Sequence, residues 1–310
     1  MRILFLGSPA FAVYPLTALA QAGYDIVGVI TQPDRPAGRK RIMTPPPVKE
    51  AAQRLNLPII QPATLRDPAV VAQLEALQPD IGIVAAYGEI LRKAVLAIPP
   101  RGYLNIHPSL LPLHRGPMPV AGAILAGDTE TGVTVMKLTP GMDSGPLLAQ
   151  ATVPLPPTAR TGALNDELFQ LGAQLLLEVL PRYAAGQITP REQDHSQATV
   201  TKLLSKEDGR VDWTRPAQVI ERMIRAYDPW PSAFTTWQGQ QLKLLDATVQ
   251  PDSAGEAAPG TIVGTAEGPL VATGSGALEL REVQPAGKRP MRGRAWLSGQ
   301  HEAAGQRLGS

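Results

Sequence analysis

Cysteine is missing from the 310 residues of the chain, and this absence excludes disulfides, thiolate metal ligands and a cysteine nucleophile. Only four histidines are present, and no two of them stand four residues apart. We therefore expect no metal site, because the spacings typical of zinc ligands are absent. A Gly-x-Ser-x-Gly motif is also missing, which argues against acyl-enzyme chemistry at a serine.

Neither sign of charge is in excess. Lys and Arg number 29 against 27 Asp and Glu, and the formal net charge of +2 excludes a strongly polybasic protein. Apolar runs are short, since residues 81–87 form one of the longest and fall far below the ~20 residues that span a bilayer. Met1 and Arg2 lead directly into a strand-like run without a signal-peptide pattern. We expect a cytoplasmic protein and, with no amphipathic stripe left over for an interface, a monomer.

Short apolar runs alternate with helical patterns over the first 180 residues. Runs at 3–6, 26–31 and 81–86 predict strands, whereas 11–22 and 166–180 carry apolar residues at helical spacing. This alternation predicts a sheet of parallel strands covered by helices. The continuously apolar run 81–86 is typical of a strand buried on both faces.

A second domain is expected, because 310 residues exceed what one hydrophobic core usually serves. A polar stretch containing Gly and Pro follows the last predicted helix and indicates a linker. Beyond it, one helix precedes short strand-like runs separated by Gly-rich turns, a pattern typical of a small β-barrel or sandwich, and five such runs fit an OB-like barrel. We predict an α/β fold with a parallel-type sheet over 1–188, a linker over 189–208, and an OB-like β-barrel over 209–310.

Asn105 and His107 are the strongest candidates for catalysis. The two-residue period of a strand places both side chains on one face. An amide can donate to a developing oxyanion, and an imidazole can exchange protons near neutral pH. The alternative is a histidine that only ends a strand and is capped by hydrogen bonds.

Two other features follow predicted strands, where ligands bind in parallel sheets. Residues 7–10 could hold an anion, but they lack the G-x-G-x-x-G spacing, so a structural turn fits equally well and dinucleotide binding is disfavoured. Residues 139–146 place Asp143 on a Gly/Pro-bracketed loop after the predicted strand 133–137. Its carboxylate could orient an imidazole, or Asp143 could be an ordinary turn residue.

Basic residues gather in two short clusters despite the balanced total charge. Such clusters indicate localised phosphate binding, although a solvated surface is the usual alternative. The first cluster consists of Arg35, Arg39, Lys40 and Arg41, and the second of Lys288, Arg289, Arg292 and Arg294.

The string Asn105-Ile106-His107-Pro108-Ser109-Leu110-Leu111-Pro112 resembles the signature of the folate-dependent formyltransferases. Arg115-Gly116 and Asp143-Ser144-Gly145 follow it in the order of that signature. Four further segments are similar to those of the members that act on methionyl-tRNA: 32–39, 206–213, 229–231 and 284–288. The resemblance covers essentially the whole chain.

This resemblance implies that the formyl group of 10-formyltetrahydrofolate is transferred to the α-amine of methionine on initiator tRNA. It assigns catalysis to Asn105, His107 and Asp143, without a metal, on a Rossmann-like domain. It implies folate contacts from Ser109, Leu110, Leu111 and Pro112, with 83–90 and the loop before Asp143 as walls of the folate site. It implies tRNA contacts from the C-terminal barrel and from Arg35, Arg39, Lys40, Arg41, Lys288 and Arg289.

The chain departs from the family pattern beside the implied folate site. Pro108 stands where many relatives carry Gly, and His114 and the segment 116–119 also differ. A formyltransferase acting on an amino sugar nucleotide is the main alternative, and the 32–39 segment argues against it. A glycinamide ribonucleotide enzyme would not need the second domain. A non-catalytic tRNA-binding protein on this scaffold would not need all three catalytic residues.

Overall fold

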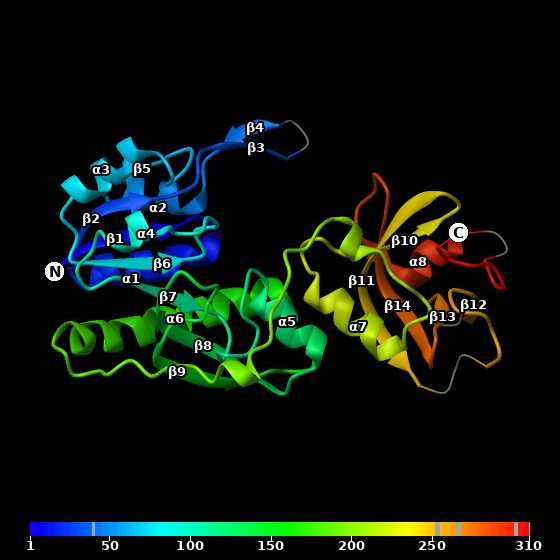
Figure 1. Cartoon of the computed structure of the whole chain (residues 1–310). Coiled ribbons are helices and arrows are strands. Elements are labelled where there is room, and N and C mark those ends of the chain that lie inside the picture. The colour runs from blue at the N-terminus through cyan, green and yellow to red at the C-terminus, as the bar shows by residue number, and fades with distance from the viewer. Residues whose placement is uncertain (39–40, 252–254, 265–267, 301–302, 310) are drawn as a thin grey trace. The chain divides into compact units, whose positions relative to one another are not determined.

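The computed structural model of the chain describes residues 1–38, 41–251, 255–264, 268–300 and 303–309. These residues form two compact units, which we describe separately (Figure 1). Unit 1 comprises residues 1–119, 130–154 and 165–201. Unit 2 comprises residues 120–129, 155–164 and 202–310. The stretch 189–208, predicted as a linker, is divided between the two units after residue 201.

A seven-stranded sheet forms the centre of unit 1, in the order β5-β2-β1-β6-β7-β8-β9. Five strands run parallel: β1 (Arg2–Gly7), β2 (Asp25–Ile30), β5 (Ile59–Ile60), β6 (Ile81–Ala85) and β7 (Tyr103–His107). Two strands are antiparallel to their neighbours: β8 (Glu130–Lys137) and β9 (Leu147–Pro154). The mostly parallel sheet confirms the predicted α/β fold, but the strand pattern did not predict the reversal of direction at β8.

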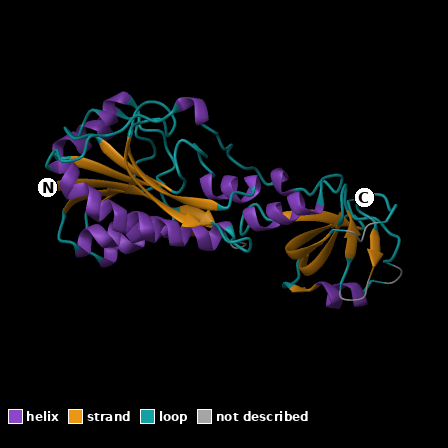
Figure 2. Cartoon of the chain, turned by 90° about the horizontal axis from the view of Figure 1, so that it is seen from below, coloured by secondary structure: helices purple, strands orange, loops and turns teal. Residues whose placement is uncertain are grey.

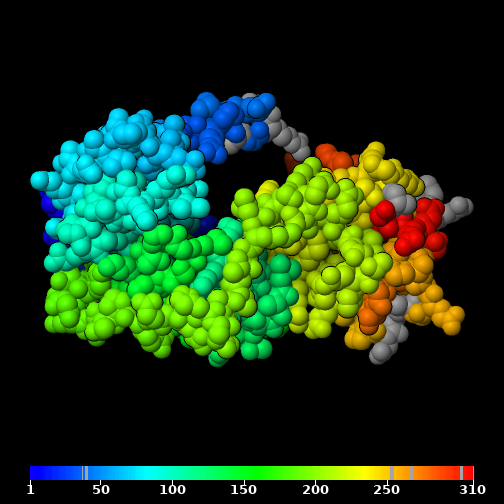
Figure 3. All heavy atoms as spheres, in the orientation of Figure 1, coloured from blue at the N-terminus to red at the C-terminus, as the bar shows by residue number. Residues whose placement is uncertain are grey.

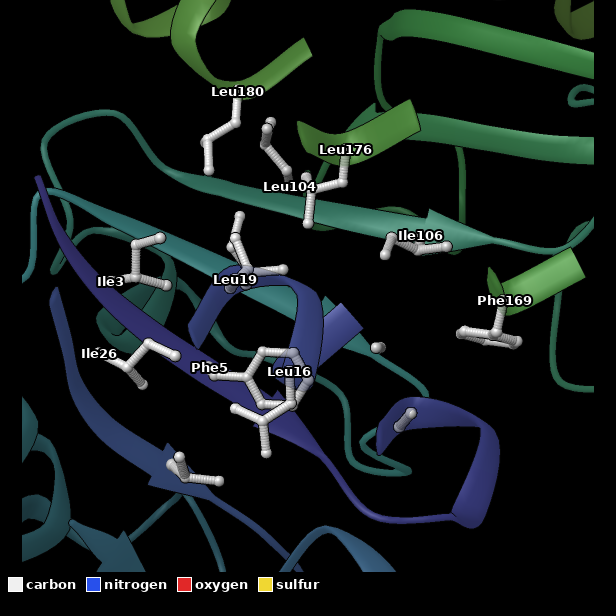
Figure 4. Close-up of a cluster of buried hydrophobic side chains, with 14 of the residues drawn as sticks. Ile3, Phe5, Leu16, Leu19, Ile26, Leu104, Ile106, Phe169, Leu176 and Leu180 are labelled. Atoms are coloured by element: carbon white, nitrogen blue, oxygen red, sulfur yellow. The ribbon is translucent and has the colours of Figure 1, made fainter. Parts of the chain in front are cut away.

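Helices lie on both sides of this sheet (Figure 2). They are η1 (Ala10–Ala12), α1 (Val13–Gln21), α2 (Pro47–Arg54), α3 (Pro68–Ala76), α4 (Lys93–Leu96) and, from residue 165 on, α6 (Thr161–Ala184). In the core drawn in Figure 4, Leu104 and Ile106 of β7 pack with Leu176 and Phe169 of α6. A side chain on Gly172 would meet Ile106, so this glycine lets α6 approach β7 closely.

A hairpin stands out from the body of unit 1 (Figure 3). It consists of β3 (Arg35–Ala37) and β4 (Ile42–Thr44), which pair antiparallel. The side chains of Ile42 and Met43 on this hairpin are exposed. Arg35 and Arg41 of the first basic cluster therefore belong to a projecting element.

Antiparallel strands dominate unit 2, in the order β10-β11-β14-β13-β12 with β15 paired to β14. The strands are β10 (Ala233–Trp237), β11 (Gln240–Gln250), β12 (Ile262–Gly264), β13 (Leu270–Ala272), β14 (Ala277–Pro285) and β15 (Met291–Arg292). The core of unit 2 includes Trp213, Trp237 and Trp296. The predicted C-terminal β domain is confirmed. No pairing among the described strands joins β10 to β12, and a closed barrel stays a prediction.

The remaining helices are α5 (Pro119–Ala126), η2 (His195–Gln197), η3 (Glu207–Gly209), α7 (Ala217–Ala226) and α8 (Gly293–Ser298). None of the helices in the described ranges is long and apolar enough to cross a membrane.

Candidate active site

Strand β7 directs Asn105 and His107 to the face opposite α6. Leu104 and Ile106 alternate with them and are buried in the core, so the predicted two-residue period holds along this strand. Asn105 is 8% exposed and His107 is 4% exposed. No hydrogen bond joins the Asn105 amide to another of the residues that the structure describes. Its N–H groups are therefore available to a ligand.

The two ring nitrogens of His107 have different surroundings. Nε2 lies 3.0 Å from the carbonyl oxygen of His114. A carbonyl only accepts hydrogen bonds, so Nε2 carries the proton of the neutral ring. Nδ1 lies 3.7 Å from Oδ2 of Asp143, which is too long for a hydrogen bond but close enough for strong charge interaction.

Burial lowers the pKa of His107, while the Asp143 carboxylate and the His114 carbonyl oppose that shift. Desolvation is the largest of these effects, so the imidazole is neutral at pH 7. Its unprotonated Nδ1 faces a carboxylate that would stabilise a proton arriving there. This pairing is suited to temporary proton acceptance.

Asp143 reaches His107 by a route that the sequence did not predict. We expected its loop at the carboxyl end of a parallel strand, but β8 is antiparallel to β7. His107 pairs with Thr134, whereas the loop begins beyond Lys137, about 10 Å along the strand at ~3.3 Å per residue. The loop therefore folds back to bring its carboxylate to the imidazole.

A backbone N–H holds the Asp143 carboxylate. The N–H of Gly116 donates to its Oδ2 over 2.8 Å. Gly116 has φ +101°, and a Cβ there would lie 2.7 Å from the carbonyl oxygen of Thr201. A glycine is needed at this position both for its backbone conformation and for the close approach.

The segment after β7 is fixed by two side chains that sequence reasoning missed. Thr134 donates from its hydroxyl to the Ser109 carbonyl over 2.6 Å and accepts from the Leu111 N–H over 3.2 Å. Gln150 donates to the Leu111 carbonyl over 2.8 Å and to the Thr134 hydroxyl over 3.0 Å. These contacts join residues distant in sequence, so no local sequence pattern predicts them.

The implied folate residues divide by burial. Ser109 and Leu111 are buried, and the Ser109 hydroxyl donates to the Leu113 carbonyl over 2.7 Å. Leu110 and Pro112 are half-buried, and the Leu111–Pro112 peptide is cis. The side chains available to a ligand are therefore those of Leu110 and Pro112.

Residues 7–10 form a turn whose polar groups are used within the protein. Ser8 accepts hydrogen bonds from the backbone N–H of Gln32 and from the hydroxyl of Thr31. Its own hydroxyl donates to the carbonyl of Tyr87. These contacts tie together the ends of neighbouring strands, in agreement with a structural turn.

The described residues of the two basic clusters are exposed to solvent. Arg35 and Arg41 are exposed at the hairpin, while Arg39 and Lys40 lie outside the described residues. The acidic neighbour Asp34 is engaged elsewhere: hydrogen bonds from Gln61 and from Lys49 hold its pKa below the ordinary value. In unit 2, Lys288 and Arg289 are exposed on the turn that follows β14.

Within the described ranges, no group of three or more His, Cys, Asp or Glu side chains could hold a metal ion.

Two family models match the chain. One described as formyl transferase covers residues 1–180, and one described as the formyl transferase C-terminal domain covers residues 203–301. Methionyl-tRNA formyltransferase of Chloroflexus aggregans is 71% identical over 303 residues, covering 97% of this chain and 98% of that protein. The protein of the same name from Bacillus licheniformis is 44% identical over 310 residues, covering 99% of this chain and 98% of its own length.

Solved structures have the same fold at low identity. HypX from Aquifex aeolicus in complex with tetrahydrofolic acid is 21% identical, with a TM-score of 0.62 over 96% of this chain and 47% of that chain. WlaRD, a sugar 3N-formyl transferase, is 16% identical, with a TM-score of 0.66 over 93% of this chain and 99% of that chain.

Proposed function

The chain belongs to the formyl transferase family, and from this premise we propose that it transfers the formyl group of 10-formyltetrahydrofolate to the α-amine of methionyl initiator tRNA. The observation that carries the proposal is the pairing of His107 with Asp143, with Asn105 on the same face of β7 as His107, within a chain so similar to methionyl-tRNA formyltransferases. Amide, imidazole and carboxylate together supply what an acyl transfer between two nitrogens needs.

In the proposed reaction the amine nitrogen attacks the formyl carbon, and the formyl oxygen becomes an oxyanion. The Asn105 amide donates to this oxyanion. Since Nε2 of His107 donates to His114, Nδ1 is the nitrogen that takes the proton released by the amine. The Asp143 carboxylate, 3.7 Å away, stabilises the imidazolium, whose charge also favours the oxyanion. The tetrahedral intermediate then collapses, the bond to N10 of the folate breaks, and N10 receives the proton.

We assign the folate contact to the segment 109–112. Thr134 and Gln150 fix its backbone before a ligand arrives, which lowers the entropy that binding must overcome. The half-buried Leu110 and Pro112 provide apolar surface for a flat heterocycle.

We assign tRNA binding to the two basic clusters and to the domain 209–310. Exposed guanidinium and ammonium groups contact phosphates and release counterions, so binding weakens as salt rises. For the hairpin, the described contributors are Arg35 and Arg41, and Arg39 and Lys40 belong to the same proposal. In the second domain the contributors are Lys288 and Arg289.

A competition between acceptors tests the function directly. The purified protein is given 10-formyltetrahydrofolate with methionyl initiator tRNA, an amino sugar nucleotide or glycinamide ribonucleotide, and the formylated product is quantified. We expect product with the tRNA alone. Formylation of the sugar nucleotide in preference to the tRNA would overturn the assigned acceptor.

The hairpin's part is tested by the salt dependence of tRNA binding. Replacing Arg35 and Arg41 by Gln should weaken binding and reduce the slope of log K against log salt by about two, one for each lost phosphate contact. A matched control replaces the exposed Arg54 and Arg66 by Gln, which removes the same charge elsewhere. If the slope were the same in both double variants, Arg35 and Arg41 would not contact tRNA phosphates.

A further inference from the structure

The segment 191–201 belongs to unit 1 and runs beside the active-site loops. Arg191 forms an isolated β-bridge with Leu147, and Val200 forms one with Arg115. The Arg115 N–H donates to the Thr199 carbonyl over 2.9 Å, and the Thr201 N–H donates to the Arg115 carbonyl over 2.7 Å. A stretch with the composition of a linker therefore pairs with the backbone of Arg115, the residue before Gly116.

Among the described contacts, Gln193 is the only side chain of this segment that forms hydrogen bonds both with Arg115 and with the loop 139–146. It is 5% exposed. Its Oε1 accepts from Nε and Nη2 of Arg115 over 3.1 and 2.7 Å. Its Nε2 donates to the backbone carbonyls of Asp143 and Gly145 over 2.8 and 2.7 Å. All four hydrogen-bonding positions of the amide are used. A flipped amide would place its N–H groups against those of Arg115 and its oxygen against the two carbonyl oxygens.

The backbone of Asp143 needs such support. Its φ of +45° lies in the left-handed region, which residues with a side chain occupy at a cost in free energy. Such a conformation persists only where the surroundings hold it. Gln193 holds the Asp143 backbone, while the Gly116 N–H holds the Asp143 carboxylate.

Arg115 in turn holds Gln193. It is 8% exposed, and within the described ranges no carboxylate forms a salt bridge with its guanidinium. Besides Gln193, the guanidinium contacts Nδ1 of His195 over 2.9 Å. A buried cation directed at an amide oxygen makes a charge-assisted hydrogen bond, which is stronger than one between neutral groups.

We propose that Gln193, anchored by Arg115, is a positioning residue that holds the loop 139–146 so that the Asp143 carboxylate stays beside Nδ1 of His107. This inference rests on the proposed formyl transfer for its kinetic consequence, because Asp143 matters there by stabilising protonated His107. Its structural consequence, the proximity of Asp143 to His107, can be measured without any substrate.

The test uses Gln193→Met, which keeps the length of the side chain and removes every hydrogen bond. The control is Gln197→Met in the same segment. Gln197 is exposed, and among the described contacts only its backbone forms a hydrogen bond. We expect kcat to fall about 10- to 100-fold with KM for tRNA within twofold in Gln193→Met, because a displacement of about 1 Å can cost ~100-fold. The control should match the unsubstituted protein.

A substrate-free readout accompanies the kinetics. The titration of His107 is followed by NMR on the full chain, and its signal is identified by its loss in His107→Ala. Described titratable groups near the ring are Asp143, which raises the pKa of His107, and His114, whose charge when protonated lowers it. We expect the pKa of His107 to fall in Gln193→Met, as it should in Asp143→Asn. An unchanged titration would overturn the positioning role even if kcat fell. If the unsubstituted protein formylates no tRNA, the proposed function fails while this titration still decides the positioning role.

Gln193→Glu covers the case in which Gln193→Met does not fold. The carboxylate keeps acceptors for Arg115 but cannot donate to the Asp143 and Gly145 carbonyls. We expect the thermal midpoint to stay near that of the unsubstituted protein while kcat falls at least tenfold. A kcat equal to that of the unsubstituted protein would contradict the proposal.

Discussion

Strand β7 and the loop 139–146 supply parts of the same cluster, but different forces hold their functional side chains. Asn105 and His107 occupy regular strand positions, and the alternating Leu104 and Ile106 are anchored in the core against α6. Asp143 lies on a loop in the left-handed region. Contacts from Gly116 and Gln193 keep it there.

Because of this difference, the position of His107 and the position of the Asp143 carboxylate should respond differently to substitutions. The strand's geometry follows from local periodicity and deep burial, so substitutions elsewhere should not reorient His107. The loop's geometry depends on hydrogen bonds from residues far away in sequence, and losing one of them should displace the carboxylate without unfolding the sheet. Substitutions on the strand should reduce transfer most, whereas substitutions around the loop should reduce it less.

The largest effect is expected for His107→Ala, which removes the strand's proton acceptor. General acid–base groups contribute about 10²- to 10⁴-fold, so single-turnover formyl transfer should fall by about 10³-fold. Binding of tRNA should stay within twofold, because His107 lies in the buried site. Transfer at the rate of the unsubstituted protein would remove His107 from the mechanism.

A smaller effect is expected for Asp143→Asn, which keeps an acceptor for the Gly116 N–H but removes the charge. We expect about a 10²-fold loss in kcat. Since Asp143 raises the pKa of His107, its removal should lower that pKa. The acid limb of the pH–rate profile, where His107 becomes protonated, should therefore move to lower pH. A shift of that limb to higher pH would contradict the assigned pairing.

The smallest effect on transfer is expected for Gly116→Ala, with Gly186→Ala as its matched control. Both glycines have positive φ, but no heavy atom of the described residues lies within 4 Å of a Cβ on Gly186. We expect Gly186→Ala to lower the free energy of unfolding by about 1 kcal/mol, from the backbone conformation alone. Gly116→Ala should lower it by ~2–4 kcal/mol, because the clash with Thr201 adds to this, and should reduce kcat about tenfold. Urea denaturation measures both losses, and equal losses would mean that the close approach at Gly116 has no energetic weight.

The sequence predicted those parts of the site whose geometry is local. The spacing of Asn105 and His107 was sufficient, because alternate residues of a strand share a face whatever surrounds them. The course of the Asp143 loop depends on the direction of β8, which no periodicity encodes, and the expected position at a parallel strand end was wrong.

Residues that act through distant partners were not predicted. Thr134 and Gln150 lie on strands, and the apolar pattern that predicts a strand does not indicate what its polar residues contact. Their contacts are to the segment after β7. Gln193 lies in a polar stretch that looks like a linker, and its neighbours Arg115 and Asp143 are dozens of residues away. Composition cannot distinguish a solvated glutamine from a buried one with four hydrogen bonds.

A double-mutant cycle tests the central claim, that strand and loop form one catalytic unit, most directly. Single-turnover formyl transfer is measured for the unsubstituted protein, His107→Ala, Asp143→Asn and the variant carrying both changes. If Asp143 acts through His107, the double variant should be no slower than His107→Ala, because effects within one unit are not additive. Losses that multiply, with the double variant slower than His107→Ala by a further ~10²-fold, would show that the two side chains act independently and would contradict the account.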